Sequence, residues 1–189
     1  MFDALFTTTT EYKKLSHALS GKGACALFGL PASGRAQVYA ALCRQLDKPL
    51  CIVTPGEAEA TRFAADLNTL GIPAAVFPAR DYVLRPIEGT AREYEYRRLA
   101  VLGELVGGRL RAVAVPAEAL TQFTTPKEDF CANTRTLHAG DTLLRDDLLA
   151  ALFGAGYTRR AQVDGPGQFS VRGDIVDIFA PDQKMPVRM

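Results

Sequence analysis

From Gly29 to Ala36 the chain reads Gly-Leu-Pro-Ala-Ser-Gly-Arg-Ala, which has the glycine spacing of a phosphate-binding loop. In the working pattern, G-x-x-x-x-G-K-[ST], backbone N–H groups surround the phosphate, the Lys reaches its oxygens and the hydroxyl holds Mg²⁺. Arg35 occupies the Lys position, where a planar guanidinium does not replace a compact ammonium. Ala36 occupies the hydroxyl position and offers no ligand oxygen. The sequence therefore predicts a degenerate phosphate loop that no longer supports nucleotide hydrolysis, made of Gly29, Ser33, Gly34, Arg35 and Ala36.

The segments around this loop predict an α/β fold. Residues 24–28, Ala-Cys-Ala-Leu-Phe, are apolar throughout and predict a buried strand, and a helix is expected over 35–46. Capping patterns place the starts of two later helices at Thr54 and Thr90. Further strands are predicted at 49–53, 72–77 and 111–115, and further helices at 11–19, 55–70, 90–106 and 117–122. This alternation predicts a parallel sheet of degenerate P-loop type, with right-handed crossovers and helices on both faces.

The chain changes character near Thr124-Thr125-Pro126. Beyond this point, a helix is predicted at 144–153 and strands at 135–138, 157–163, 168–172 and 174–180. Gly165-Pro166-Gly167 is predicted to be the turn between antiparallel strands at 157–163 and 168–172. We therefore expect an α/β domain over 1–125 and a second, smaller α+β domain over 126–189, in a chain truncated at its C-terminal end.

The bulk composition limits the classes of function. The chain has 189 residues, of which 48% are hydrophobic and 23% charged, so it is expected to be globular and not membrane-spanning. A formal net charge of +1 argues against a domain dedicated to coating nucleic acid. The four cysteines form no CxxC pair, so no zinc site is predicted, and Cys25 and Cys51 are expected to be small core residues.

Two parts of the sequence are similar to known bacterial repair proteins. The loop at 29–36, followed by Val53-Thr54-Pro55, resembles the start of a superfamily 2 helicase domain. Residues 156–163 (GYTRRAQV) and 165–179 (GPGQFSVRGDIVDIF) resemble the inserted domain of UvrB and, more closely, the matching N-terminal module of bacterial transcription-repair coupling factors. Residues 77–86 (FPARDYVLRP) fit the same family. UvrB itself keeps the Lys and Thr of the loop, so the degenerate loop favours the coupling-factor family.

This resemblance implies a non-catalytic module that recruits UvrA to lesions where RNA polymerase has stalled, in a cytoplasmic bacterial protein. The parent protein is implied to be an ATP-dependent DNA translocase. Its ATP and Mg²⁺, and its contacts with RNA polymerase and DNA, would belong to parts outside this chain. For these residues themselves, no catalytic group, cofactor or metal is expected.

The resemblance also implies which residues bind UvrA. In UvrB the UvrA-facing surface has the patterns Tyr-x-Arg and Phe-Arg-Val-Arg-Gly. Tyr157 and Arg159 match the first pattern, and Phe169 and Arg172 match the second, whose first arginine is Ser170 here. Arg160 is a candidate replacement because it follows Arg159 directly. The implied UvrA-binding residues are therefore Arg159, Arg160, Phe169 and Arg172.

Strand alternation places Ser170 and Arg172 on one face of a strand and Phe169 on the other, and Arg159 is expected to join the face of Arg172. Arginine forks on a rigid sheet suit a carboxylate-rich partner. The alternative interpretation is a solvated polar face with internal counter-ions, for which Asp164, Asp174 and Asp177 are available. Two other functions also stay open, a loop that binds nucleotide without cleaving it and a UvrB-type DNA-binding fragment.

Overall fold

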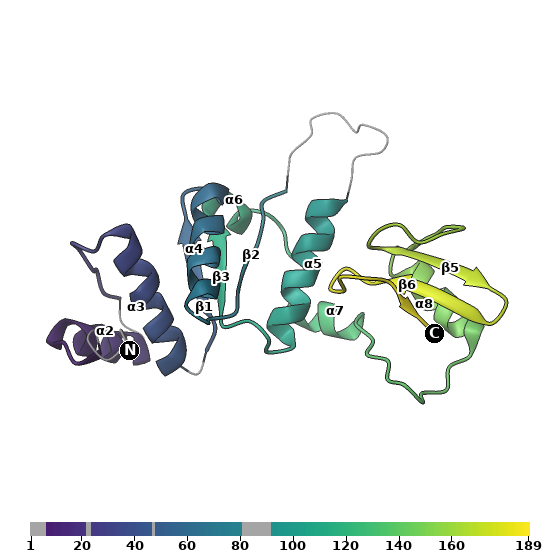
Figure 1. Cartoon of the computed structure of the whole chain (residues 1–189), viewed down its shortest axis with the longest axis horizontal. Helices are drawn as coiled ribbons and strands as arrows, with labels where there is room; N and C mark the ends of the chain where they lie inside the picture. The colour runs from purple at the N-terminus through teal and green to yellow at the C-terminus, as the bar shows by residue number, and fades with distance from the viewer. Residues whose placement is uncertain (1–6, 22–23, 47, 81–91) are drawn as a thin grey trace. The chain divides into compact units, whose positions relative to one another are not determined.

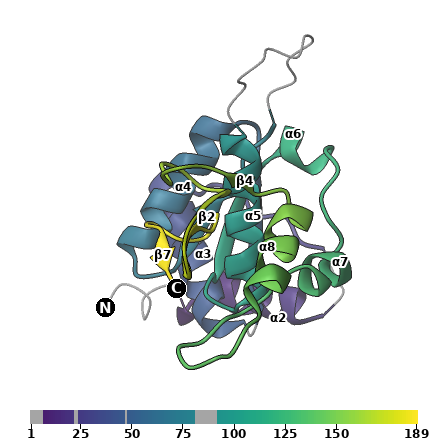
Figure 2. The same cartoon turned by 90° about the vertical axis from the view of Figure 1, so that its right-hand side faces the viewer.

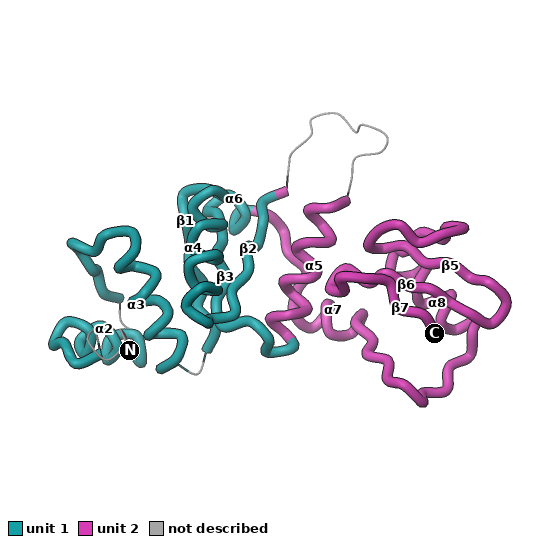
Figure 3. Tube along the Cα trace, viewed as in Figure 1, with its two compact units in different colours: residues 1–79, 107–121 teal, residues 80–106, 122–189 magenta. Residues whose placement is uncertain are grey.

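The computed structural model describes residues 7–21, 24–46, 48–80 and 92–189 (Figure 1). The chain forms two compact units, residues 1–79 with 107–121 and residues 80–106 with 122–189 (Figure 3). The helix after residue 92 thus belongs to the second unit, whereas a single division at residue 125 would assign it to the first. The folding domains 1–125 and 126–189 stay a prediction. Within the described residues, no helix combines the length and apolar character needed to cross a membrane.

The helices of the first unit are α2 (Thr10–Ser20), α3 (Ala32–Gln45), α4 (Glu57–Thr69) and α6 (Ala117–Leu120). They lie near the predicted positions, except that α3 begins three residues before the predicted start, within the predicted loop. Thr9 caps α2, because its hydroxyl oxygen accepts the Tyr12 N–H at 3.2 Å. Gly71 follows α4 with φ of 75°, a left-handed conformation that glycine adopts without strain, and it ends the helix as predicted.

The predicted cap of α4 is wrong by two residues. Thr54 is the last residue of the preceding strand, and Gly56 is the N-cap of α4. The Thr54 hydroxyl donates to the Gly56 carbonyl oxygen at 2.9 Å instead of accepting a helix N–H. The cap predicted at Thr90 lies outside the described residues.

A parallel sheet organises the first unit, as the alternation predicted. Its strands are β1 (Leu50–Thr54), β2 (Ala74–Val76) and β3 (Ala112–Pro116), in the order β1-β3-β2. Both neighbouring pairs are parallel, and Ala112 lies beside Leu50 of β1 and beside Ala74 of β2. The α/β class is therefore confirmed, and β3 is the central strand. A helicase-like origin for this sheet stays a prediction.

Small side chains make the core of the first unit. Ala60 of α4 and Ala112 and Ala114 of β3 have no exposed surface, and Ala36 and Ala40 of α3 join the same cluster. Because alanine side chains are small, the backbones of α3, α4 and the sheet can pack closely against one another. At one side of this cluster the rings of Tyr39 and Phe63 pack at 5.5 Å between centroids.

The predicted strand at 24–28 is wrong. These residues are exposed and belong to no strand, and Phe28 is 88% exposed. An apolar run forms a strand only where a neighbouring strand pairs with its backbone, and the sheet consists of β1, β3 and β2 alone among the described residues. For the same reason Cys25 is exposed, and Cys51, on the uncovered side of β1, is exposed as well, so neither is a core residue.

The second unit combines three helices with a mixed sheet. The helices are α5 (Glu93–Val106), α7 (Lys127–Ala132) and α8 (Arg145–Gly154), and the strands are β4 (Thr158–Arg159), β5 (Gln168–Arg172), β6 (Ile175–Phe179) and β7 (Val187–Arg188). The strand order is β4-β5-β6-β7. Figure 2 labels the outer strands β4 and β7 together with α8. The strand predicted at 135–138 is wrong, because these residues are exposed and form no ladder.

The pairing of β4 corrects a second prediction. β5 and β6 form an antiparallel hairpin whose turn contains Gly173 at φ 63°, and β6 and β7 are also antiparallel. In contrast, β4 and β5 are parallel, and Thr158 lies beside Gln168. Gly165-Pro166-Gly167 therefore belongs to a loop between parallel strands and is not a hairpin turn. A strand of two residues is too short for its sequence to indicate which neighbour it pairs with or in which direction it runs.

A buried arginine fastens α5 to the segment after α6. Arg98 is 3% exposed and donates to Gln122 Oε1 at 3.2 Å and to Thr124 Oγ1 at 2.8 Å. Gln122 also joins this segment to Arg80, because its Oε1 accepts the Arg80 N–H at 2.7 Å and its Nε2 donates to the Arg80 carbonyl at 3.1 Å. Three separate stretches of the second unit thus meet through two polar side chains.

We expect Arg98→Met to lower the free energy of unfolding by about 1–3 kcal/mol, because it leaves buried acceptors without a donor. Arg97→Met is the matched control, since Arg97 is exposed on the same helix, and it should change stability by less than about 0.5 kcal/mol. Urea denaturation of the two variants measures both values. Equal losses would show that the Arg98 contacts are not what stabilises this region.

The four thiols are expected to differ in reactivity. Cys43 is 1% exposed, its thiol donates to the Arg111 carbonyl at 3.5 Å, and burial raises its pKa against the lowering effect of Arg111 and Arg44. A raised pKa leaves less of the reactive thiolate at neutral pH. In the native protein a thiol reagent should therefore modify Cys25 and Cys131 before Cys43. Burial also raises the pKa of Cys51, but Cys51 is exposed and should react before Cys43 for that reason. Four equivalents reacting at one rate would contradict this, and Cys43→Ala should remove only the slow equivalent.

Candidate partner-binding site

The register of the second sheet assigns its residues to two faces. Phe169 lies beside Ile178 and Val171 beside Val176, so these four apolar residues share one face. That face packs on Leu148 and Leu152 of α8. On the opposite face Ser170 lies beside Asp177, and Asp177 beside Arg188 of β7. The sheet therefore has a covered apolar face and a polar face.

Phe169 belongs to the core and not to a binding surface. Its side chain has no exposed area, and its ring meets the ring of Phe153 edge to face at 5.1 Å between centroids. A side chain without exposed surface cannot touch a partner, so the prediction that Phe169 contacts UvrA directly is wrong for the folded domain. Its burial explains instead why β5 is held firmly against α8.

The arginines of β4 occupy different positions from those expected. Because β4 and β5 are parallel, Arg159 lies in register with Phe169 and is therefore placed at the edge of the α8-covered face. The expectation that it shares the face of Arg172 is wrong. The Arg160 N–H donates to the Phe169 carbonyl at 2.8 Å, so Arg160 continues along the β5 edge. Both side chains are exposed.

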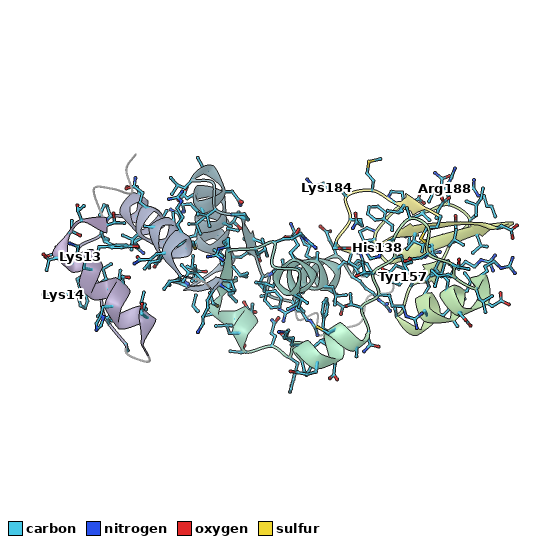
Figure 4. The ribbon with its side chains drawn as sticks, turned by 90° about the horizontal axis from the view of Figure 1, so that it is seen from below. Lys13, Lys14, His138, Tyr157, Lys184 and Arg188 are labelled. Carbon is cyan, nitrogen blue, oxygen red and sulfur yellow. The ribbon has the colours of Figure 1, made fainter. Side chains whose placement is uncertain are left out.

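Asp177 is the carboxylate around which the charged groups of the polar face interact. Its oxygens accept two hydrogen bonds from Arg188, from Nε at 2.7 Å and from Nη2 at 3.1 Å (Arg188 is labelled in Figure 4). The Ser170 hydroxyl lies 3.4 Å from its Oδ2. These contacts, first of all the Arg188 hydrogen bond, hold the pKa of Asp177 below its ordinary value of 3.8, and the Arg172 charge lowers the pKa further. The pairing also raises the pKa of Arg188.

Asp177 therefore pairs directly with Arg188, and Arg172 interacts with this carboxylate only at longer range. Among the described residues, no carboxylate lies within ion-pair distance of Arg159, Arg160 or Arg172. Arg172 is exposed, and its Nη2 donates to the Ala161 carbonyl at 3.1 Å, which fixes the direction of the guanidinium. We call these three residues the arginine rim.

The residues of the predicted phosphate loop are part of a helix. α3 begins at Ala32, with Pro31 as its N-cap, so Ser33, Gly34, Arg35 and Ala36 lie in its first turns. The Arg35 N–H donates to the Pro31 carbonyl at 3.1 Å, and its guanidinium lies 3.6 Å from Glu59 Oε1 of α4. Ala36 is 3% exposed within the alanine core, and Gly29, at φ 81°, precedes the helix. The Arg35 and Ala36 side chains therefore contact other residues of the first unit.

Comparison with known proteins places the second sheet in a family. Residues 136–189 match the UvrB interaction domain. The relatives include transcription-repair-coupling factors of Bacillus subtilis (29% identical over 165 residues, 86% of this chain) and of Mycobacterium tuberculosis strain CDC 1551 (36% over 167 residues, 84% of this chain). The chain resembles the UvrB-like module of transcription-repair coupling factors. It spans only 14% and 13% of the length of these two relatives.

The UvrB interaction domain, as we call residues 136–189, contains α8 and all four strands of the second sheet. It includes the whole arginine rim and the Asp177–Arg188 pair, whereas the loop at 29–36 lies outside the match. Sequence reasoning missed the Asp177–Arg188 pair. The available signal was the polar Asp177 within the otherwise apolar run Ile-Val-Asp-Ile-Phe, which predicts an outward carboxylate but not the strand that neutralises it.

The depressed pKa of Asp177 predicts a pH-dependent stability. Since the folded-state pKa lies below the ordinary value of 3.8, the carboxylate contributes stability that is complete above that pH and is lost as the pH falls through the folded pKa. Asp177→Asn should therefore be less stable than the wild type at pH 7, and the difference should shrink below about pH 4. Denaturant unfolding from pH 7 to pH 3 measures it.

Asp174→Asn is the matched control, because Asp174 is an exposed carboxylate in the adjacent β5–β6 turn. Asp174→Asn should reproduce the change in net charge but should not lower the free energy of unfolding at pH 7. A difference between Asp177→Asn and the wild type that stays constant down to pH 3 would contradict a contribution from the ion pair.

Proposed function

We propose that the UvrB interaction domain of this chain binds UvrA through the arginine rim, and that the chain is a non-catalytic recruitment module in transcription-coupled nucleotide excision repair. The observation that most supports this is the position of the rim. Arg159, Arg160 and Arg172 are exposed within the matched domain, and no carboxylate of the described residues pairs with them. Three exposed guanidinium groups without a close ion pair on one small sheet fit a carboxylate-bearing partner.

The rigidity of the sheet strengthens this proposal. Phe169 holds β5 against α8, and the Ala161 carbonyl orients Arg172, so little conformational entropy is lost when the rim meets a partner. Arginine is also enriched among the residues that dominate binding energy at interfaces. The role proposed for Phe169 is accordingly indirect, because it holds β5, which carries Arg172 and pairs with β4, the strand of Arg159.

The parent protein is proposed to be an ATP-dependent DNA translocase that recognises stalled RNA polymerase. The support is the name of the relatives, transcription-repair-coupling factor, of which this chain covers a small part. ATP, Mg²⁺, RNA polymerase and DNA would then bind elsewhere in the parent. A nucleotide site at Arg35 is the weaker alternative, because the Arg35 guanidinium already lies beside Glu59.

We expect Arg159→Ala, Arg160→Ala and Arg172→Ala each to weaken binding to purified UvrA by about tenfold or more if the residue makes a central contact. Titration calorimetry with the 189-residue chain measures the affinity, and thermal melts show whether each variant is folded. Arg135→Ala is the matched control, since Arg135 is exposed just outside the UvrB interaction domain. Wild-type affinity in all three folded rim variants would refute the assignment of the surface.

A further inference from the structure

A polar hollow of about 520 Å³ lies between α2 and α3 in the first unit. The two helices touch through Tyr12, Val38, Ala41 and Leu42, and the Tyr12 hydroxyl donates to Gln45 Oε1 at 2.9 Å. These contacts fix the distance between the helices beside the hollow. The volume lies within the range of about 300–1,000 Å³ that small-molecule sites occupy.

Basic side chains from both helices line this hollow, beside hydroxyl-bearing and apolar ones. Lys13 and His17 come from α2 and Arg44 from α3, and none of the lining residues in the described part of the chain has a carboxylate. Arg44 Nη2 donates to the Leu70 carbonyl at 2.5 Å, which holds the guanidinium in place. The hydroxyl-bearing residues Ser16 and Ser20 lie on the same wall. The hollow thus gathers positive charge and hydrogen-bond donors from two helices.

The spacing on α2 produces this arrangement. Lys13, Ser16, His17 and Ser20 follow one another at intervals of three, one and three residues, which places them on one face of a helix. Lys14 is the next residue in sequence and does not line the hollow, although it is an exposed lysine of the same helix (Figure 4). Substituting Lys13 or Lys14 removes the same charge from α2, but only Lys13 lines the hollow. Comparing the two variants therefore separates the effect of position on ligand binding from the effect of charge.

We propose that the hollow binds a compact polyphosphate anion, a small molecule with at least two linked phosphate groups. Ammonium, imidazole and guanidinium groups that line one hollow from two helices can donate to the several acceptor oxygens of such an anion. A nucleobase has no platform here, because Tyr12, the aromatic lining residue, is 6% exposed. Nucleic acid needs a succession of backbone contacts along a surface, and a hollow between two helices does not provide one.

Pyrophosphate is the probe for this site, used with the 189-residue chain at low ionic strength. Titration calorimetry should show binding, and pyrophosphate should raise the melting temperature by mass action. Lys13→Gln and, separately, His17→Gln should each weaken binding, about tenfold or more for Lys13. Lys14→Gln should retain the wild-type affinity. Lys13, Lys14 and His17 are exposed, so each substitution should leave the fold intact.

Three results would overturn the proposal. The first is no heat and no thermal shift with millimolar pyrophosphate. The second is an equal loss in Lys13→Gln and Lys14→Gln, which would indicate general attraction to the charge of α2. The third is tight binding of a single-stranded oligonucleotide that Lys14→Gln also weakens, which would indicate a nucleic-acid surface. Because the hollow is in the first unit, none of these results depends on UvrA binding.

Discussion

The burial of Phe169 is the constraint on which the candidate site depends. Successive residues of a strand face opposite sides, so a phenylalanine locked against α8 determines the direction of every other residue of β5. Ser170 and Arg172 are thereby directed to the polar face, and β6 must present Asp177 beside Ser170. A shift of register by one residue would expose the Phe169 ring and bury the Arg172 guanidinium. The free energy lost in this way is larger than the free energy that any single surface contact contributes.

Much of the fold follows from local pattern, and its errors come from contacts that no local pattern encodes. Helical spacing of apolar residues predicted α4, and the alternation of apolar runs with helical segments predicted the parallel sheet of the first unit. The exposed run at 24–28 and the parallel partner of β4 were missed for one reason. Strand formation and strand direction depend on which distant backbone segment supplies the hydrogen bonds. The apolar composition of a segment does not identify that partner.

The candidate site was predictable only in part, and chiefly through resemblance. The arginines could be named from the patterns around Tyr157 and β5, but their faces could not, since the face of Arg159 depends on the direction of β4. Phe169 was assigned to the wrong role because a motif does not distinguish a residue that touches a partner from one that supports the touching strand. Asp177 was weighed as a counter-ion for the rim, yet it pairs with Arg188 of β7, eleven residues further along the chain. That pairing is visible only in the folded sheet.

Packing and phosphate binding are competing uses of the segment at the start of α3. Ala36 is almost wholly buried against the other alanines of the core, where the hydroxyl of a Mg²⁺-binding residue would lack both water and space. Arg35 reaches Glu59 on α4 and so joins the two helices that cover the same sheet. A loop that wraps an anion must keep its amides and its cation unengaged, whereas here the Arg35 amide completes a helical hydrogen bond and its guanidinium lies beside a carboxylate. Once these groups serve the interior of the protein, restoring a lysine alone would not restore a nucleotide site, because the backbone around it would still be helical.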